Sequence, residues 1–183
     1  MLERFEDKKR GVKVKRIFVL LVIVGCLALS NLWAQDLKVG DLAPLFNVKT
    51  DEGKEFDLGS QKGRWTILYF FPKAGTPGCT KQAISFRDEF ATLKSLGINV
   101  YGISTDTIEA QANFKKEHHL NFTMLADPAA TVVNLYGLKQ PYLNLSKRWS
   151  FIIGPDLRIR FIENEVDVEN DAKNLIKKIY EIK

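Results

Sequence analysis

The apolar run WTILYFF, from Trp65 to Phe71, constrains the fold most because turn-forming residues flank it on both sides. Its length and its aromatic and β-branched residues are typical of a central strand that is buried on both faces. A strand buried in this way needs helices packed against each side of its sheet. The run therefore predicts a layered α/β domain.

The rest of the pattern alternates helices with short strands, and it begins with a β-hairpin around Asp51-Glu52-Gly53. A parallel crossover should lead from Trp65–Phe71 through a helix to the next buried strand, Asn99–Ser104. That helix is predicted as one piece, with Ala83, Phe86, Phe90, Leu93 and Leu96 on its apolar face and Lys81, Gln82, Arg87, Asp88 and Lys94 on its polar face. The other predicted elements are helices at 107–119, 127–136 and 167–182, a strand at 122–125, and a hairpin of strands 148–153 and 158–163. The prediction is a central mixed sheet flanked by helices, with an N-terminal β-hairpin extension.

The first 34 of the 183 residues form a separate segment, in which a basic stretch precedes the apolar run Ile17–Leu29. This order is typical of a secretory signal peptide, and the apolar run is short for a membrane span. We expect cleavage after Ala34, which leaves residues 35–183 as one domain. Two alternatives stay open, namely a lipoprotein cleavage box ending at Cys26 and an uncleaved N-terminal anchor.

Charge and cysteine content both change once this leader is set aside. Seven Lys and Arg residues against three acids in residues 1–34 account for most of the net charge of +5. The remaining domain is nearly neutral, so we expect no nucleic-acid partner, and contact with a membrane only through an uncleaved or lipidated N-terminus. Cys79 is the only cysteine left, so the domain can form no internal disulfide.

Cys79 follows Thr76, Pro77 and Gly78, a sequence that also reads as the start of a helix. With Thr76 as N-cap and Pro77 in the first turn, the thiol would lie near unpaired backbone N–H groups at the positive end of the helix dipole. Both features favour the thiolate, which is the nucleophilic form. A buried, inert cysteine is the alternative interpretation.

The segment FFPKAGTPGCTKQAISFRDEF resembles the active-site segment of peroxiredoxins of the bacterioferritin comigratory protein, or peroxiredoxin Q, branch. The family pattern Pro-x-x-x-Thr-x-x-Cys is met by Pro72, Thr76 and Cys79. The segment ISTDTIEAQANFKKEHHLNFTMLADPAATVVNLYG is similar to the segment that follows in the family. RWSFII matches its Arg-x-Ser/Thr-Phe strand and so indicates Arg148. The resemblance covers about Leu37 to Glu163 and implies a thioredoxin-like fold.

The resemblance also implies a role for each matched residue. Cys79 would attack a hydroperoxide and become a sulfenic acid, and Arg148 would stabilise the thiolate and the leaving oxygen. Thr76 would bind the peroxide or the sulfur, the Gly78 backbone would complete the pocket, and Pro72 would shield the thiolate. No cofactor is implied, and the adjacent His118 and His119 point in different directions, which disfavours a metal pair.

The sequence departs from the family at Ile84, where many relatives carry a second cysteine. We therefore expect a one-cysteine cycle in which an external thiol, such as a thioredoxin-like protein, reduces Cys79. We expect a monomer or homodimer acting outside the cytoplasm. One alternative is a thiol-disulfide oxidoreductase, which is disfavoured because Gln82 stands where a Cys-x-x-Cys pair needs cysteine. The others are a peroxide sensor and a redox-inert binding domain.

Overall fold

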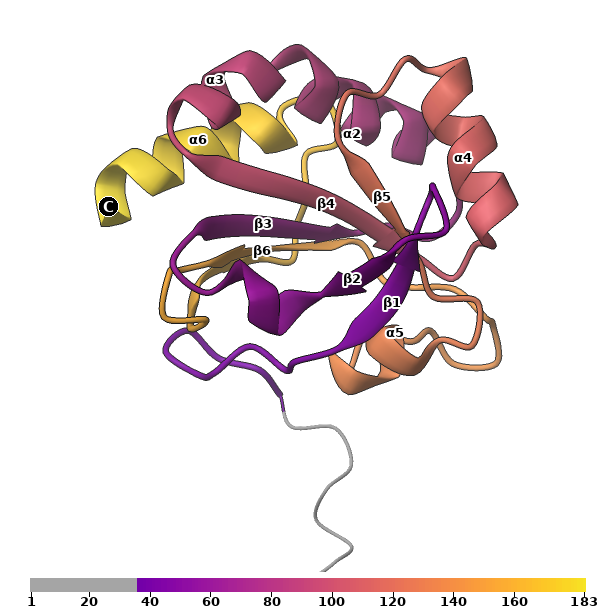
Figure 1. The fold of residues 1–183 in the computed structure, drawn as a ribbon, viewed down its shortest axis with the longest axis horizontal. Coiled ribbons are helices and arrows are strands. Elements are labelled where there is room, and N and C mark those ends of the chain that lie inside the picture. The colour runs from indigo at the N-terminus through magenta and orange to yellow at the C-terminus, as the bar shows by residue number, and fades with distance from the viewer. Residues whose placement is uncertain (1–35) are drawn as a thin grey trace, which may run out of the picture. The chain divides into compact units, whose positions relative to one another are not determined.

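The computed structural model describes residues 36–183, which form a seven-stranded mixed sheet with helices on both faces (Figure 1). The strand order is β2-β1-β5-β4-β3-β6-β7. The strands are β1 (Asn47–Thr50), β2 (Glu55–Asp57), β3 (Trp65–Phe70), β4 (Ile98–Ser104), β5 (Thr123–Ala126), β6 (Trp149–Ile153) and β7 (Ile159–Glu163). The helices are the 3-10 turn η1 (Leu58–Gln61), α2 (Pro77–Asp88), α3 (Phe90–Ser95), α4 (Ile108–Glu117), α5 (Thr131–Leu135) and α6 (Asp171–Ile182).

Strand β3 lies inside the sheet, between β4 and β6, as its apolar sequence predicts. It pairs in parallel with β4 and antiparallel with β6, and the predicted hairpins β1–β2 and β6–β7 extend the sheet on either side. Alternate β3 side chains enter two cores, one under α2, α3, α4 and α6 and the other on the face that α5 covers (Figure 1). The predicted fold class, a thioredoxin-like mixed sheet between helices with an N-terminal hairpin, is confirmed.

An aromatic stack on Tyr69 holds α2 against the sheet. The Tyr69 ring is fully buried and stacks on Phe86 of α2 with 4.5 Å between ring centroids. Gly102 on the neighbouring strand leaves room for this ring, because a Cβ atom there would lie 2.5 Å from it. Since α2 carries Cys79 at its start, this stack also fixes the position of the cysteine.

The prediction of one continuous helix after Cys79 is wrong, because the helix is interrupted at Glu89. Glu89 ends α2 and begins α3, with backbone angles (φ −92°, ψ 3°) that leave the helical range. The break directs α3 along β4, where Leu93 is completely buried. The 3.6-residue period alone did not reveal it, because both pieces keep their apolar side chains toward the same core.

Two helix starts also lie further along the chain than the sequence predicts. Helix α5 begins at Thr131 instead of Asp127-Pro128, because the Asp127 carboxylate accepts hydrogen bonds from the backbone N–H groups of Thr131 (2.8 Å) and Val133 (2.9 Å). Asp127 therefore caps the helix from outside it. Helix α6 begins at Asp171, four residues after the predicted Asp167.

The expected leader, residues 1–34, and its candidate residue Cys26 lie outside the described residues. Within residues 36–183, no helix has both the length and the apolar character that a membrane crossing requires.

Candidate active site

Cys79 lies in the first turn of α2, just beyond the carboxyl end of β3. Thr76 has the extended backbone of an N-cap residue, and Pro77 follows in the first turn of the helix. The Thr76 hydroxyl does not cap the helix, however, and donates to the backbone carbonyl of Lys73 at 3.0 Å. Thr76 is therefore the N-cap residue, as the sequence predicts, but its hydroxyl closes the preceding turn and accepts no hydrogen bond from the N–H groups of the first helical turn.

A polar cluster at the end of β4 holds the loop that precedes Cys79. The Asp106 carboxylate accepts hydrogen bonds from the backbone N–H of Ala74 (2.8 Å) and from the Ser104 hydroxyl (2.6 Å). The Gln111 side chain in turn donates to the Ser104 hydroxyl oxygen at 2.7 Å. Because β3 and β4 are parallel, their carboxyl ends meet here. The cluster therefore joins the loop before Cys79 to the loop that follows β4.

Arg148 is the charged group that the structure places on the sulfur of Cys79. The antiparallel register pairs Phe70 with Trp149, so Arg148 falls at the end of β3 from which the Cys79 loop leaves. Its Nη2 atom lies 3.3 Å from Cys79 Sγ. A Cβ atom on Gly78 would lie 3.4 Å from the same Nη2, at ordinary van der Waals contact, so the guanidinium lies directly beside the Gly78 backbone.

The site is nearly closed to solvent at its reactive atom. Cys79 is 1% exposed, whereas the other predicted site residues, Pro72, Thr76, Gly78 and Arg148, are half-buried. A guanidinium next to a buried sulfur stabilises negative charge on that sulfur more strongly than it would in water. The arrangement therefore suits a thiolate that reacts with a small molecule.

A buried hydrogen-bond chain continues from Arg148 through three residues that sequence reasoning did not select. Arg148 Nη1 donates to Gln82 Oε1 (2.6 Å), and Gln82 Nε2 donates to Asp171 Oδ2 (2.7 Å). The Ser150 hydroxyl donates to the same Asp171 oxygen at 2.8 Å. Gln82, Asp171 and Ser150 are each at most 1% exposed. We call these three residues the buried polar chain.

Gln82 therefore does not belong to the exposed polar face on which the helical period placed it. It is completely buried, three residues after Cys79 and on the same side of α2. That spacing was the one signal that could have identified it. Asp171 and Ser150 gave no such signal, because only the folded chain brings α6 and β6 to α2.

Burial raises the pKa of Asp171 to about 6, and the hydrogen bonds from Gln82 and Ser150 oppose this effect. Its Oδ1 atom is buried and has no hydrogen-bond partner among the described residues, which agrees with a carboxyl group that is costly to ionise. The folded state therefore favours the protonated acid, and stability from this group is lost as the pH rises through about 6.

This shift predicts that the free energy of unfolding falls by roughly 1–2 kcal/mol between pH 5 and pH 8 on account of Asp171. Urea unfolding of the wild type and of Asp171→Asn at both pH values measures the effect. The asparagine variant should lack this part of the pH dependence, since it cannot ionise. Equal pH dependence in the two proteins would contradict the assignment.

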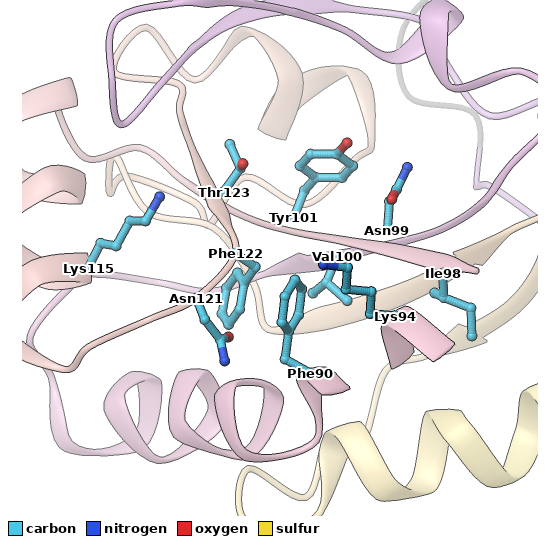
Figure 2. Close-up of a pocket in the computed structure, with 10 residues that line it drawn as sticks. All are labelled: Phe90, Lys94, Ile98, Asn99, Val100, Tyr101, Lys115, Asn121, Phe122 and Thr123. Atoms are coloured by element: carbon cyan, nitrogen blue, oxygen red, sulfur yellow. The ribbon is translucent and has the colours of Figure 1, made fainter. Parts of the chain in front are cut away.

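A separate pocket of about 250 Å³ lies at the opposite, amino end of β4 and β5 (Figure 2). Phe90 and Phe122 face each other within it at 6.2 Å between ring centroids. Its polar groups are largely bound inside the protein, since Tyr101 donates to Gln61 and Lys115 pairs with the buried Asp51. None of the candidate catalytic residues lines it. The lining residues are Phe90, Lys94, Ile98, Asn99, Val100, Tyr101, Lys115, Asn121, Phe122 and Thr123.

Comparison with known proteins agrees with this geometry. The AhpC/TSA family model matches residues 39–162. Peroxiredoxin Bcp of Escherichia coli K12 is 36% identical over 140 residues, which cover 73% of this chain and 90% of the relative. The crystal structure of the peroxidoxin BcpB from Mycobacterium tuberculosis is 29% identical, with a TM-score of 0.75, and the match covers 80% of this chain and 99% of that one. Xylella fastidiosa PrxQ, at 22% identity and a TM-score of 0.74, shares the fold over 81% of this chain and 98% of its own.

A thioredoxin-like sheet with a cysteine at a helix start and an arginine on its sulfur defines the peroxiredoxin class. The chain belongs to the AhpC/TSA family, and its relatives place it with the Bcp and Q peroxiredoxins. Peroxiredoxins are thiol-dependent peroxidases, so this chain is an enzyme of that kind.

Proposed function

We propose that the enzyme reduces hydrogen peroxide and organic hydroperoxides through a sulfenic acid at Cys79, which an external thiol then reduces. The observation that supports this most directly is the 3.3 Å approach of Arg148 Nη2 to Cys79 Sγ in the first turn of α2. A guanidinium and a helix N-terminus together stabilise negative charge on the sulfur before reaction.

The Cys79 thiolate attacks one oxygen of the hydroperoxide, so an S–O bond forms while the O–O bond breaks. Sulfur gives up two electrons and becomes sulfenic acid, while the peroxide is reduced. The second oxygen leaves as hydroxide or alkoxide and takes a proton from solvent to give water or an alcohol. Arg148 stabilises the negative charge as it moves from sulfur to the leaving oxygen.

The residues around Cys79 serve binding and protection in this proposal. The Thr76 hydroxyl donates to Lys73, so its oxygen can still accept a hydrogen bond from the protonated peroxide oxygen. The Gly78 and Cys79 backbone N–H groups complete the pocket. We expect Pro72 to limit access of water to the sulfur, as the resemblance to the family implies.

The second half of the cycle needs a thiol from another molecule. Cys79 is the only cysteine in residues 36–183, and the half-buried Ile84 occupies the position of a second one. One external thiol forms a disulfide with Cys79 and releases water, and a second thiol then frees the Cys79 thiol as an external disulfide leaves. Because Cys79 is 1% exposed, the first turn of α2 must open for this step. The leader suggests that the reaction takes place outside the cytoplasm.

One equivalent of hydrogen peroxide should convert Cys79 to a sulfenic acid that a dimedone probe captures, adding one label per chain. The test uses the full chain with Cys26→Ala, so that Cys79 is the sole thiol. Mass spectrometry of the peptide that contains Cys79 locates the label. Adding a small thiol before the probe should yield a mixed disulfide instead. An unmodified Cys79 after peroxide treatment would exclude the proposal.

A further inference from the structure

We propose that Asp171 is a positioning residue for the peroxidase reaction, acting through the Gln82 amide to hold the Arg148 guanidinium against Cys79. This inference rests on the proposed roles of Cys79 and Arg148 and adds to them a carboxyl group from the opposite end of the chain. Asp171 makes no hydrogen bond to the sulfur, and its hydrogen bonds lead to Arg148 through Gln82.

The direction of the hydrogen bonds in the buried polar chain supports this role. A glutamine side chain offers an oxygen that accepts and a nitrogen that donates, and only the oxygen suits the always protonated guanidinium. Asp171 Oδ2 accepts from Gln82 Nε2 at 2.7 Å, which turns Oε1 toward Arg148 Nη1 at 2.6 Å. An acceptor at position 171 thus selects the amide orientation that holds Arg148.

Asp171 is itself held rigidly enough to do this. Ser150 on β6 donates to the same oxygen, and the backbone N–H of Ala172 donates to the Ser85 hydroxyl of α2 at 3.1 Å. These bonds join the start of α6 to both β6 and α2. Arg148 precedes β6 and Cys79 lies on α2. The start of α6 therefore holds both of these active-site residues in place.

Three charged or titratable groups act on Asp171 from the elements packed around it. They are Tyr69 on β3, Arg148 before β6, and Glu163 on β7. Arg148 is the only cation among them, and it reaches Asp171 through Gln82. The charge of an ionised Asp171 opposes negative charge on the Cys79 sulfur. Its hydrogen bond with Gln82 acts in the other direction, because it holds the cationic Arg148 against that sulfur.

The test measures the rate constant for oxidation of Cys79 by hydrogen peroxide at pH 7.5 in a double-mutant cycle. We expect Asp171→Asn to lower this rate constant roughly 10-fold in the full chain, because an amide at position 171 no longer imposes one orientation on Gln82. In an Arg148→Ala background the same change should have less than about a 2-fold effect, since the group being positioned is gone.

Asp127→Asn is the matched control, because Asp127 is also a buried carboxyl with a raised pKa but bonds only to the start of α5. It should leave the rate constant unchanged even where it lowers stability. If Asp171→Asn does not fold, Gln82→Met interrupts the same chain and should cause a similar loss.

An unchanged or increased rate in Asp171→Asn, or an equal loss in both Arg148 backgrounds, would overturn the proposal. For Gln82→Met, full retention of the rate would do the same. These results leave the role of Cys79 untouched, because peroxide turnover by a Cys79→Ser variant is what would refute the proposed function.

Discussion

Replacing Cys79 with serine should lower peroxide consumption by roughly three orders of magnitude or more, to the background of the added thiol. A serine hydroxyl stays protonated at neutral pH, and its oxygen cannot accept the peroxide oxygen by giving up two electrons. The change is small in volume, so the buried position should tolerate it. A peroxide-consumption assay with dithiothreitol as the thiol measures the loss.

Cys26→Ala is the matched control for this experiment, since it removes the other cysteine of the chain. It should retain full turnover with a soluble thiol. Far-ultraviolet circular dichroism and thermal unfolding of both variants report whether the fold persists. Turnover by Cys79→Ser equal to that of the wild type would refute the proposed mechanism.

Replacing Arg148 with alanine should produce the second largest loss, about 100-fold in the rate constant for Cys79 oxidation by peroxide. The side chain donates to Cys79 Sγ through Nη2 and to Gln82 through Nη1, so alanine removes the cation beside the sulfur and frees the amide. Stopped-flow measurement of a single oxidation separates this step from reduction by the external thiol.

Arg148→Lys distinguishes charge from geometry at the same position. A lysine ammonium is a point charge and cannot span two fixed partners as the planar guanidinium does, so we expect a loss of about 10-fold. The exposed neighbour Lys147 provides the control, and Lys147→Ala should leave the rate constant unchanged. If Arg148→Ala oxidises as fast as the wild type, the guanidinium does not stabilise the reaction.

The architecture was largely predictable because it depends on local patterns. A buried run such as Trp65–Phe71 has few stable environments, and the hairpins and crossovers that follow it obey general rules of chain connection. Helix ends were less predictable. The break at Glu89 and the late start of α5 depend on packing against β4 and on the Asp127 cap, neither of which changes the apolar period.

Some residues of the candidate site could likewise be predicted from their neighbours in the sequence, and others could not. The Pro72–Cys79 segment is contiguous, and the position of Arg148 follows once strands 65–71 and 148–153 are taken as antiparallel neighbours. Thr76 is the N-cap residue that the sequence predicts, but its hydroxyl donates to the Lys73 carbonyl, because a hydroxyl near a turn has several acceptors within reach.

The sequence by itself determined that this chain builds an α/β domain with one cysteine at a helix start, since hydrophobic period, helix-start residues and cysteine count are properties of neighbouring residues. Only the tertiary structure decided which buried groups hydrogen-bond to Arg148 and to each other. Gln82 and Asp171 are 89 residues apart and meet because α6 packs beside α2. A buried polar group acquires its partner, and its cost of ionisation, from whatever the fold brings to it, which no local pattern encodes.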